Sequence, residues 1–259
     1  MKNTKLVLSL GIITLLTSCG ASSGKEVTRA DAEKLLADST TATSAEGYEL
    51  PKKFTLNATI ATSGTMSYAS DEAGTYSVSY DGEKKYSHYK KTSNDKSEET
   101  WAYVKDDACE VASITVVGSS TTKQRSSSSS GYFDKSAERV TRFLYLSPTY
   151  IAAVKGRLIE LDGTASSSSS SAKIEESYHS TGAGNVTVSV TRKGDTVGSL
   201  SQDSSYELKM NNNMVTSFTS HTKNTDGSSQ DVGMSFDWSK CDLSYPNLDD
   251  FSEGIGGTD

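Results

Sequence analysis

Histidines, serines and cysteines are the residues of this chain whose side chains could most readily do chemistry. His88, His179 and His221 lie far apart, in stretches where polar and apolar residues alternate. Metal sites usually show closely spaced ligands such as HxH or HExxH, and neither pattern occurs. No serine is set in a recognisable nucleophile elbow. We therefore expect no catalytic, metal or cofactor site, and we expect that the protein is not an enzyme.

Cys19 differs from the other cysteines because of what precedes it. Lys2 and Lys5 are followed by an apolar run from Leu6 to Leu16, the pattern of a secretory signal. The run is shorter than the roughly 20 residues that a membrane-spanning helix needs. Leu16-Thr17-Ser18-Cys19 resembles the bacterial lipobox. This resemblance implies transfer of diacylglycerol to the Cys19 thiol and cleavage before it, with residues 1–18 as the signal peptide.

Cys109 and Cys241 are the two cysteines left for the mature chain. In an exported protein they suggest a disulfide, and one closing so long a loop would stabilise the fold by up to about 4 kcal/mol. Two separate buried thiols are an equally good interpretation, because free cysteine often packs as a small core residue. The two lack the CxxC spacing of redox and zinc sites.

The net charge limits the partners. The formal charge is −7, and removal of residues 1–18 takes away Lys2 and Lys5 and no acidic residue, which leaves −9. An acidic surface repels phosphate, so we expect no nucleic acid partner. It also disfavours contact of the protein surface with anionic lipid. Membrane contact is therefore expected through the lipid on Cys19, on the extracytoplasmic side of the cell membrane.

Hydrophobic periodicity divides the mature chain into a tether and one domain. Residues 19–27 are short, polar and rich in glycine and serine, as in a flexible tether. The domain is expected over residues 28–251, with a disordered tail over 252–259. Thr28 is typical of a helix N-cap, and the helix that follows should end near Ala37 or Asp38. A helical pair is expected from Ser136 to Ile159.

Alternating patterns predict antiparallel strands on both sides of that helical pair. They are expected around residues 54–60, 76–80, 85–91, 101–104, 111–117, 186–190, 206–210, 214–218 and 232–238. Asp81-Gly82 favours a tight hairpin turn between two of them. The serine runs Ser126 to Ser130 and Ser166 to Ser171 are expected to be mobile loops. The stretches Tyr76–Val104 and Tyr206–Trp238 resemble each other weakly, as an internal repeat or as two similar meanders.

The order of these elements is similar to that of lipoprotein carriers of the LolA/LolB and LppX/LprG type. That resemblance implies an α+β fold in which a strongly curved, half-barrel-like antiparallel sheet is covered by a few helices around an apolar cavity. No sequence motif carries it, so it transfers no site residues. Two functions follow as alternatives: a carrier of a lipid or other apolar ligand, or a surface lipoprotein that binds a protein or acts as an envelope component.

Overall fold

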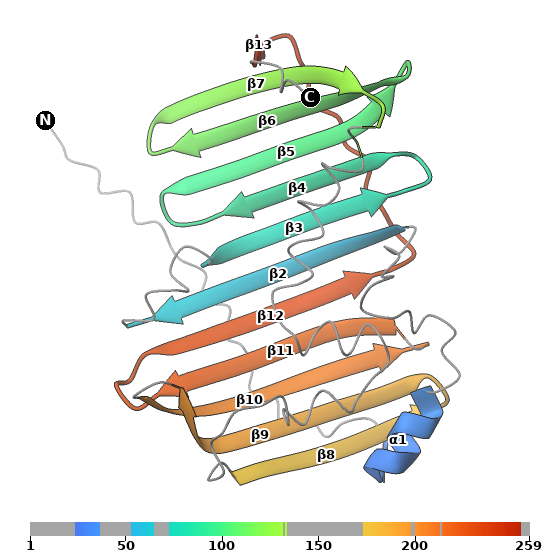
Figure 1. The fold of residues 1–259 in the computed structure, drawn as a ribbon, viewed down its shortest axis with the longest axis vertical. Helices are drawn as coiled ribbons and strands as arrows, with labels where there is room; N and C mark the ends of the chain where they lie inside the picture. The colour runs from blue at the N-terminus through green and yellow to red at the C-terminus, as the bar shows by residue number, and fades with distance from the viewer. Residues whose placement is uncertain are drawn as a thin grey trace, which may run out of the picture.

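The computed structural model describes residues 24–36, 53–64, 73–131, 133, 173–197, 200–212 and 214–254. In these residues the chain forms one sheet of 13 strands and one helix (Figure 1). The strand order is β1-β8-β9-β10-β11-β12-β2-β3-β4-β5-β6-β7-β13. All neighbouring strands are antiparallel except β13 and β7, which are parallel.

Two meanders make up the sheet. The N-terminal meander runs through β2 (Lys53–Ser63), β3 (Gly74–Asp81), β4 (Tyr86–Thr92), β5 (Lys96–Lys105), β6 (Ala108–Val117) and β7 (Ser120–Ser129). The C-terminal meander runs through β8 (Lys173–Gly182), β9 (Asn185–Val197), β10 (Leu200–Asn211), β11 (Met214–Asn224) and β12 (Ser229–Asp237). The short strands β1 (Lys25–Val27) and β13 (Ser252–Glu253) pair with β8 and β7. Pairing of β12 with β2 joins the two meanders.

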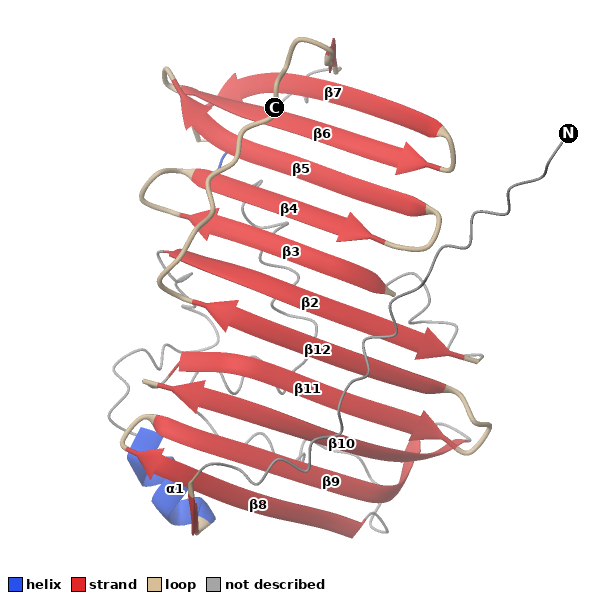
Figure 2. Cartoon of the chain, turned by 180° about the vertical axis from the view of Figure 1, so that it is seen from behind, coloured by secondary structure: helices blue, strands red, loops and turns tan. Residues whose placement is uncertain are grey.

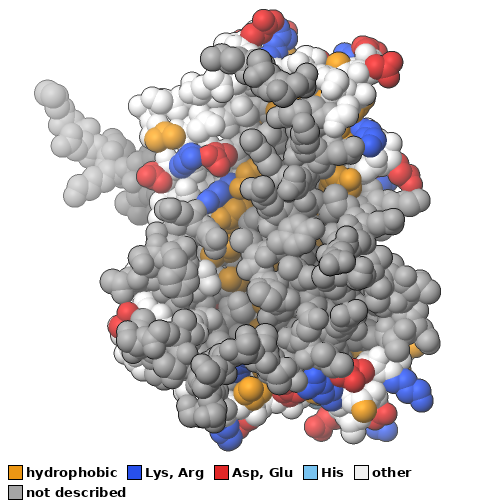
Figure 3. Space-filling view, viewed as in Figure 1, with side chains coloured by type: hydrophobic (Ala, Val, Ile, Leu, Met, Phe, Trp, Pro, Cys, Tyr) orange, Lys and Arg blue, Asp and Glu red, His pale blue; other side chains and the backbone are white. Residues whose placement is uncertain are grey.

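The two faces of the sheet differ in chemistry because side chains alternate along each strand. One face, here called the apolar face, carries the main core, for example Phe54, Leu56, Val188 and Leu208, each fully buried. It is the side viewed in Figure 1. In Figure 3, which has the same view, hydrophobic side chains appear towards the middle and most charged ones around the rim. The opposite side, the polar face, is seen in Figure 2.

Helix α1 (Arg29–Leu36) covers the β8 end of the apolar face (Figure 1). The Thr28 hydroxyl donates to Asp31 Oδ2 at 2.8 Å and accepts from the Asp31 backbone N–H at 3.1 Å, so Thr28 is the predicted N-cap. Ala32 is fully buried and Leu35 packs against the core. This short helix is therefore held by its cap and by one apolar side against the sheet.

The predicted fold class is wrong. Within the described residues the sheet is open and not strongly curled, and α1 is its one helix, so it is neither a half-barrel nor covered by a few helices. Bulges bend a sheet, and the irregular registers lie only in the C-terminal meander, near Ser180, Gln202 and Lys209. From β11 to β7 the pairing is regular. The helical pair predicted from Ser136 to Ile159 lies outside the described residues.

Two local predictions also need correction. The serine run from Ser126 is not a loop, because β7 continues to Ser129 in register with β6. Backbone pairing with β6 outweighs the weak strand preference of serine. The Asp81-Gly82 turn is wider than expected, since β3 ends at Asp81 and β4 begins at Tyr86. The left-handed residue of this loop is Lys85, with φ 50°, rather than Gly82. The run Ser166 to Ser171 lies outside the described residues.

Candidate functional site: a C-terminal strap over an aromatic cluster

After β12 the chain crosses the polar face of the N-terminal meander as an extended segment, residues 239–251, here called the strap (Figure 2). Asp237 starts the crossing, because its carboxylate accepts hydrogen bonds from the Ser239 N–H at 2.9 Å and hydroxyl at 2.7 Å. These bonds lower the pKa of Asp237. The Thr55 hydroxyl then donates to the Lys240 carbonyl at 3.0 Å. At the far end, β13 pairs with β7 and closes the path.

Beneath the strap lies a second, smaller apolar cluster. It is built on the polar face from side chains of β4, β5 and β6, and the strap adds Phe251. The members are Tyr86, Trp101, Tyr103, Ala112 and Phe251, with Ile114, Cys241 and Leu248 packed against them. We call this group the aromatic cluster. The strap therefore supplies the cover that buries these rings on a face that is otherwise largely polar.

Ser244 is the main anchor of the strap. The Tyr86 hydroxyl donates to the Ser244 carbonyl at 2.6 Å and accepts from the Ser244 N–H at 2.9 Å. Trp101 Nε1 donates to the Ser244 hydroxyl at 3.4 Å. Burial of the Tyr86 ring raises the pKa of its hydroxyl, which therefore stays protonated and able to donate at neutral pH.

His88 lies beside this anchor, stacked on Trp101 with ring centroids 4.8 Å apart and planes 6° from parallel. Its Nε2 is 2.9 Å from Glu99 Oε1, and Lys90 Nζ is 3.2 Å from Glu99 Oε2. An ionised carboxylate can only accept, so Nε2 carries the proton and Nδ1 faces the Ser244 hydroxyl at 3.4 Å. Burial lowers the pKa of His88, and Glu99 opposes this only in part.

The lowered pKa predicts acid sensitivity of the strap. Because the unfolded chain takes up the His88 proton before the folded chain does, the contribution of His88 to stability is complete above pH 6.5 and is lost as the pH falls below it. We expect His88→Gln, which keeps a donor for Glu99, to flatten the loss of unfolding free energy between pH 7.5 and 5. Urea unfolding at a series of pH values measures this. Parallel pH profiles of the two proteins would contradict it.

The order hydroxyl, imidazole, carboxylate in Ser244, His88 and Glu99 resembles a proton relay. The Ser244 oxygen, however, already accepts from Trp101, lies 3.3 Å from the Tyr86 hydroxyl, and is a long 3.4 Å from the imidazole. The Ser244 N–H is bonded to Tyr86 as well. We interpret the three residues as the fastening of the strap, since these groups point at one another.

Above the anchor, the strap presents apolar side chains to solvent. Tyr245 is 57% exposed and Leu243 37% exposed. The Tyr245 ring meets Tyr86 and Tyr103 edge-on, with centroids 5.3 and 5.0 Å apart, so its position is fixed from below. We call Leu243 and Tyr245 the strap surface. It places a rigid aromatic ring in solvent above a packed base.

The sequence-predicted cysteines do not come together. Cys109 belongs to the core of the apolar face, whereas Cys241 packs against the aromatic cluster on the polar face. They form no disulfide with each other, so the alternative of separate thiols holds in the structure. Burial raises the pKa of Cys241 to about 11, which keeps this thiol neutral and unreactive. Cys19 lies outside the described residues.

The three histidines lie on different strands, His88 on β4, His179 on β8 and His221 on β11. His221 pairs with Asp231 at 2.7 Å. In the part of the chain that the structure describes, no three His, Cys, Asp or Glu residues group as metal ligands. The spacing GxSxG does occur once, in residues 20–24, but only Gly24 of these is described and it leads directly into β1.

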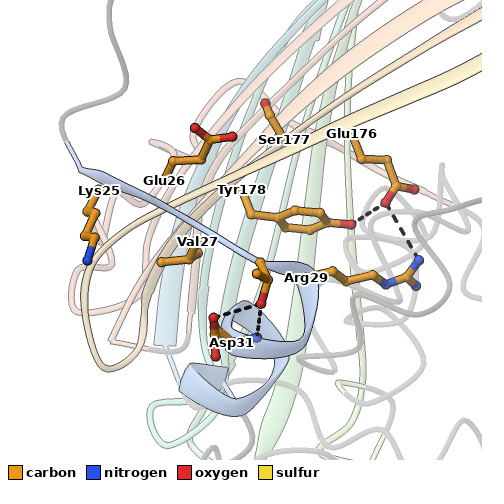
Figure 4. Close-up of a pocket in the computed structure, with 9 residues that line it drawn as sticks. Lys25, Glu26, Val27, Arg29, Asp31, Glu176, Ser177 and Tyr178 are labelled. Carbon is orange, nitrogen blue, oxygen red and sulfur yellow. Dashed lines mark hydrogen bonds and ion pairs between the residues drawn. The ribbon is translucent and has the colours of Figure 1, made fainter.

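Two open clefts lie in the described residues, and each is lined by both polar and apolar groups. One, of about 580 Å³, lies between β1, the start of α1 and β8 (Figure 4). There the Tyr178 hydroxyl donates to Glu176 at 2.6 Å, and Arg29 lies 3.7 Å from the same carboxylate. The other, of about 310 Å³, lies along β6 and β7. Neither has the enclosed apolar lining of an acyl-chain site.

Sequence patterns found the aromatic strands but not the strap. Residues 239–251 show no alternation, and their partners on the N-terminal meander lie more than 100 positions away, as for Ser244 and Tyr86. The one available signal was the presence of apolar residues among polar ones in this segment, namely Leu243, Tyr245, Pro246, Leu248 and Phe251. No described helix is long and apolar enough to cross a membrane.

No protein-family model matches this chain, and no curated protein is significantly similar to it in sequence. Any functional conclusion therefore depends on the chain's own residues and geometry.

Proposed function

We propose that the protein is a lipid-anchored, extracytoplasmic envelope component that binds a macromolecular partner through the strap surface. The lipid on Cys19 holds it at the membrane. Of the two functions that the sequence left open, this is the interaction protein rather than the carrier of an apolar ligand.

The open sheet supports this choice. A carrier needs an enclosed apolar space for acyl chains, and that expectation depended on a strongly curved sheet around helices. In the described residues the sheet is open, and the two clefts described above are open to solvent and have mixed polar and apolar linings. The acidic charge of the mature chain also disfavours nucleic acid as the partner.

The main observation that supports this proposal is that Leu243 and Tyr245 are exposed on a segment that is fastened to the sheet along its length. Tyrosine is enriched at protein interfaces because its ring buries a large area at little cost in conformational entropy. Tyr86 and Tyr103 already contact the Tyr245 ring edge-on, so binding costs little further side-chain conformational entropy. The strap surface is thus prepared for contact.

A binding experiment with envelope material tests the proposal. Lipidated protein, purified in mild detergent, is titrated against cell-envelope fragments from the same organism. We expect Tyr245→Ser to weaken binding by about tenfold, the effect of losing one central aromatic contact. Val117→Ser is the matched control, because Val117 is similarly exposed, at 52%, but is the last residue of β6, away from the strap.

Equal binding by wild type and Tyr245→Ser would contradict the strap surface as the interface. The carrier alternative is tested on the same material. Mass spectrometry of protein purified without detergent should find no stoichiometric lipid beyond the lipid attached to Cys19. A retained acyl ligand, or saturable uptake of a fluorescent fatty acid, would instead support the carrier function.

A further inference from the structure

The strap is held by contacts that depend on its own short sequence and not on its covalent link to β12. Both backbone groups of Ser244 bond to the Tyr86 hydroxyl, at 2.6 and 2.9 Å. Farther along, β13 pairs in parallel with β7, and the Gly254 N–H donates to the Arg125 carbonyl at 2.7 Å. The same residues on another molecule could make the same bonds.

The surface that the strap contacts, here called the strap floor, consists of Tyr86, Trp101, Tyr103 and Ala112 on β4 to β6 with Lys123 and Arg125 on β7. Residues 239–254 contain one lysine and four acidic residues. Lys123 Nζ lies 3.4 Å from the Asp250 carboxylate and 5.8 Å from the centre of the Phe251 ring. Arg125 lies 3.7 Å from Glu253. The floor is therefore complementary to an acidic, extended peptide with an aromatic residue between its carboxylates.

Few side chains of the strap are buried. In residues 239–254, all of which the structure describes, Phe251 is the one buried residue. The Asp250 and Glu253 side chains are 81% and 86% exposed, and ion pairs of such exposed groups contribute little to stability. Segments with few buried apolar contacts open at a lower free energy than the whole fold does. We therefore expect the strap to open more readily than the strands beneath it.

The strap floor is held together by its own strands. β4, β5, β6 and β7 pair with one another in regular register. When the strap opens, the Tyr86, Trp101 and Tyr103 rings lose their cover, and the exposure of this apolar surface to water favours the return of a cover. The sixteen residues 239–254 reach about 50 Å when extended, which is enough to cross the floor of a neighbouring molecule.

We propose that the strap floor is also a docking surface for the strap of a second copy of this chain, so that two molecules exchange straps. Each exchanged strap keeps the contacts that it makes within one molecule, which makes the exchange a low-cost route to a dimer. The strap of the same chain competes, because its covalent link gives it a high effective concentration. Exchange should therefore increase with protein concentration. This inference goes beyond the proposed function and does not rest on the lipid anchor or on the strap surface.

A synthetic peptide of residues 239–254, labelled at its N-terminus with a fluorophore, tests the docking surface. Fluorescence anisotropy follows its binding to the full-length protein in mild detergent. Phe251→Ser in the protein, and not in the peptide, weakens the competing strap of the same chain, because it removes the one buried side chain of that strap. We expect this variant to bind the peptide about tenfold more tightly than wild type does.

A second variant provides the readout if the first one fails to fold. Asp250→Lys with Glu253→Lys in the protein changes two exposed side chains, so the fold should stay intact. The reversed charges repel Lys123 and Arg125 and so weaken the strap of the same chain. We expect this double variant to bind the unchanged peptide roughly fivefold more tightly than wild type does.

Glu26→Lys with Glu175→Lys is the matched control. Both residues are exposed and the change in charge is the same, but they lie on β1 and β8, at the opposite end of the sheet. This variant should bind the peptide as wild type does. A peptide of the same composition in scrambled order should bind to none of these proteins.

Exchange between whole molecules is tested with two forms of the wild-type protein that carry different affinity tags. After the two forms are mixed at high concentration, we expect capture of one tag to retain the other form as well. Excess unlabelled strap peptide should abolish this co-capture, because it occupies the same floor.

Three results would overturn the inference: neither weakened variant binds the peptide more tightly than wild type, the scrambled peptide binds equally well, or the two tagged forms are never captured together. Such a failure would leave the proposed function standing. Binding of envelope fragments through Tyr245 requires only one molecule with its own strap in place.

Discussion

Tyr86→Ala should destabilise the protein by about 3–5 kcal/mol, the range for removing a large aromatic side chain from a packed site. Tyr86 is fully buried, and it fastens the strap through the carbonyl and the N–H of Ser244. Its ring also supports Tyr245 edge-on. The substitution therefore opens a cavity in the aromatic cluster and removes the main anchor of the strap. Urea unfolding gives the free energy, and hydrogen exchange of residues 239–251 reports strap release.

Tyr86→Phe is the control for the hydroxyl alone. Ser244 is exposed, so water can satisfy its N–H and carbonyl when the hydroxyl is lost. We expect a loss of about 1–2 kcal/mol, with faster exchange in the strap. If Tyr86→Ala unfolds within about 1 kcal/mol of wild type and strap exchange is unchanged, the strap is not fastened through this residue.

Cys19→Ala should move nearly all of the protein from the membrane to the soluble fraction. Cys19 provides the thiol of the lipobox-like stretch, and two acyl chains, at about 0.8 kcal/mol per buried methylene, hold a protein stably at a bilayer. Fractionation followed by detergent phase partitioning measures the change.

Cys241→Ala is the matched control for loss of a cysteine. Its thiol is half-buried against the aromatic cluster and makes no disulfide with Cys109. This variant should remain with the membranes and lose only a little stability. Cys19→Ala protein that still sediments with membranes would refute lipidation as the anchor.

Alternation of apolar and polar residues in the sequence predicted the strands that bury one side and expose the other. Phe54, Leu56, Ala58 and Ile60 alternate with polar residues, and β2 buries these four side chains on the apolar face. The Thr28 cap likewise marks the start of α1. For β2 and for the start of α1, the deciding pattern spans only a few neighbouring residues, so it can be recognised from the sequence alone.

What the sequence could not show depends on distant partners. β7 is a strand because β6 pairs with it, although its serines are poor strand formers. The strap is ordered because Tyr86 and Trp101, far away in sequence, bind Ser244. The shape of the sheet depends on registers and bulges, which hydrophobic alternation does not encode. A resemblance based only on the order of elements therefore gave the wrong curvature.

The joining of β12 to β2 has a consequence for folding during synthesis. The N-terminal meander emerges first, and its own hairpins are local and can form early. The β12 partner of β2, and the strap that covers the aromatic cluster, come from the last part of the chain. Until these arrive, β2 lacks its β12 neighbour, and the rings of Tyr86, Trp101 and Tyr103 lack their strap cover. Exposed strand edges and apolar rings invite aggregation, so the nascent chain is most vulnerable just before its C-terminus is released.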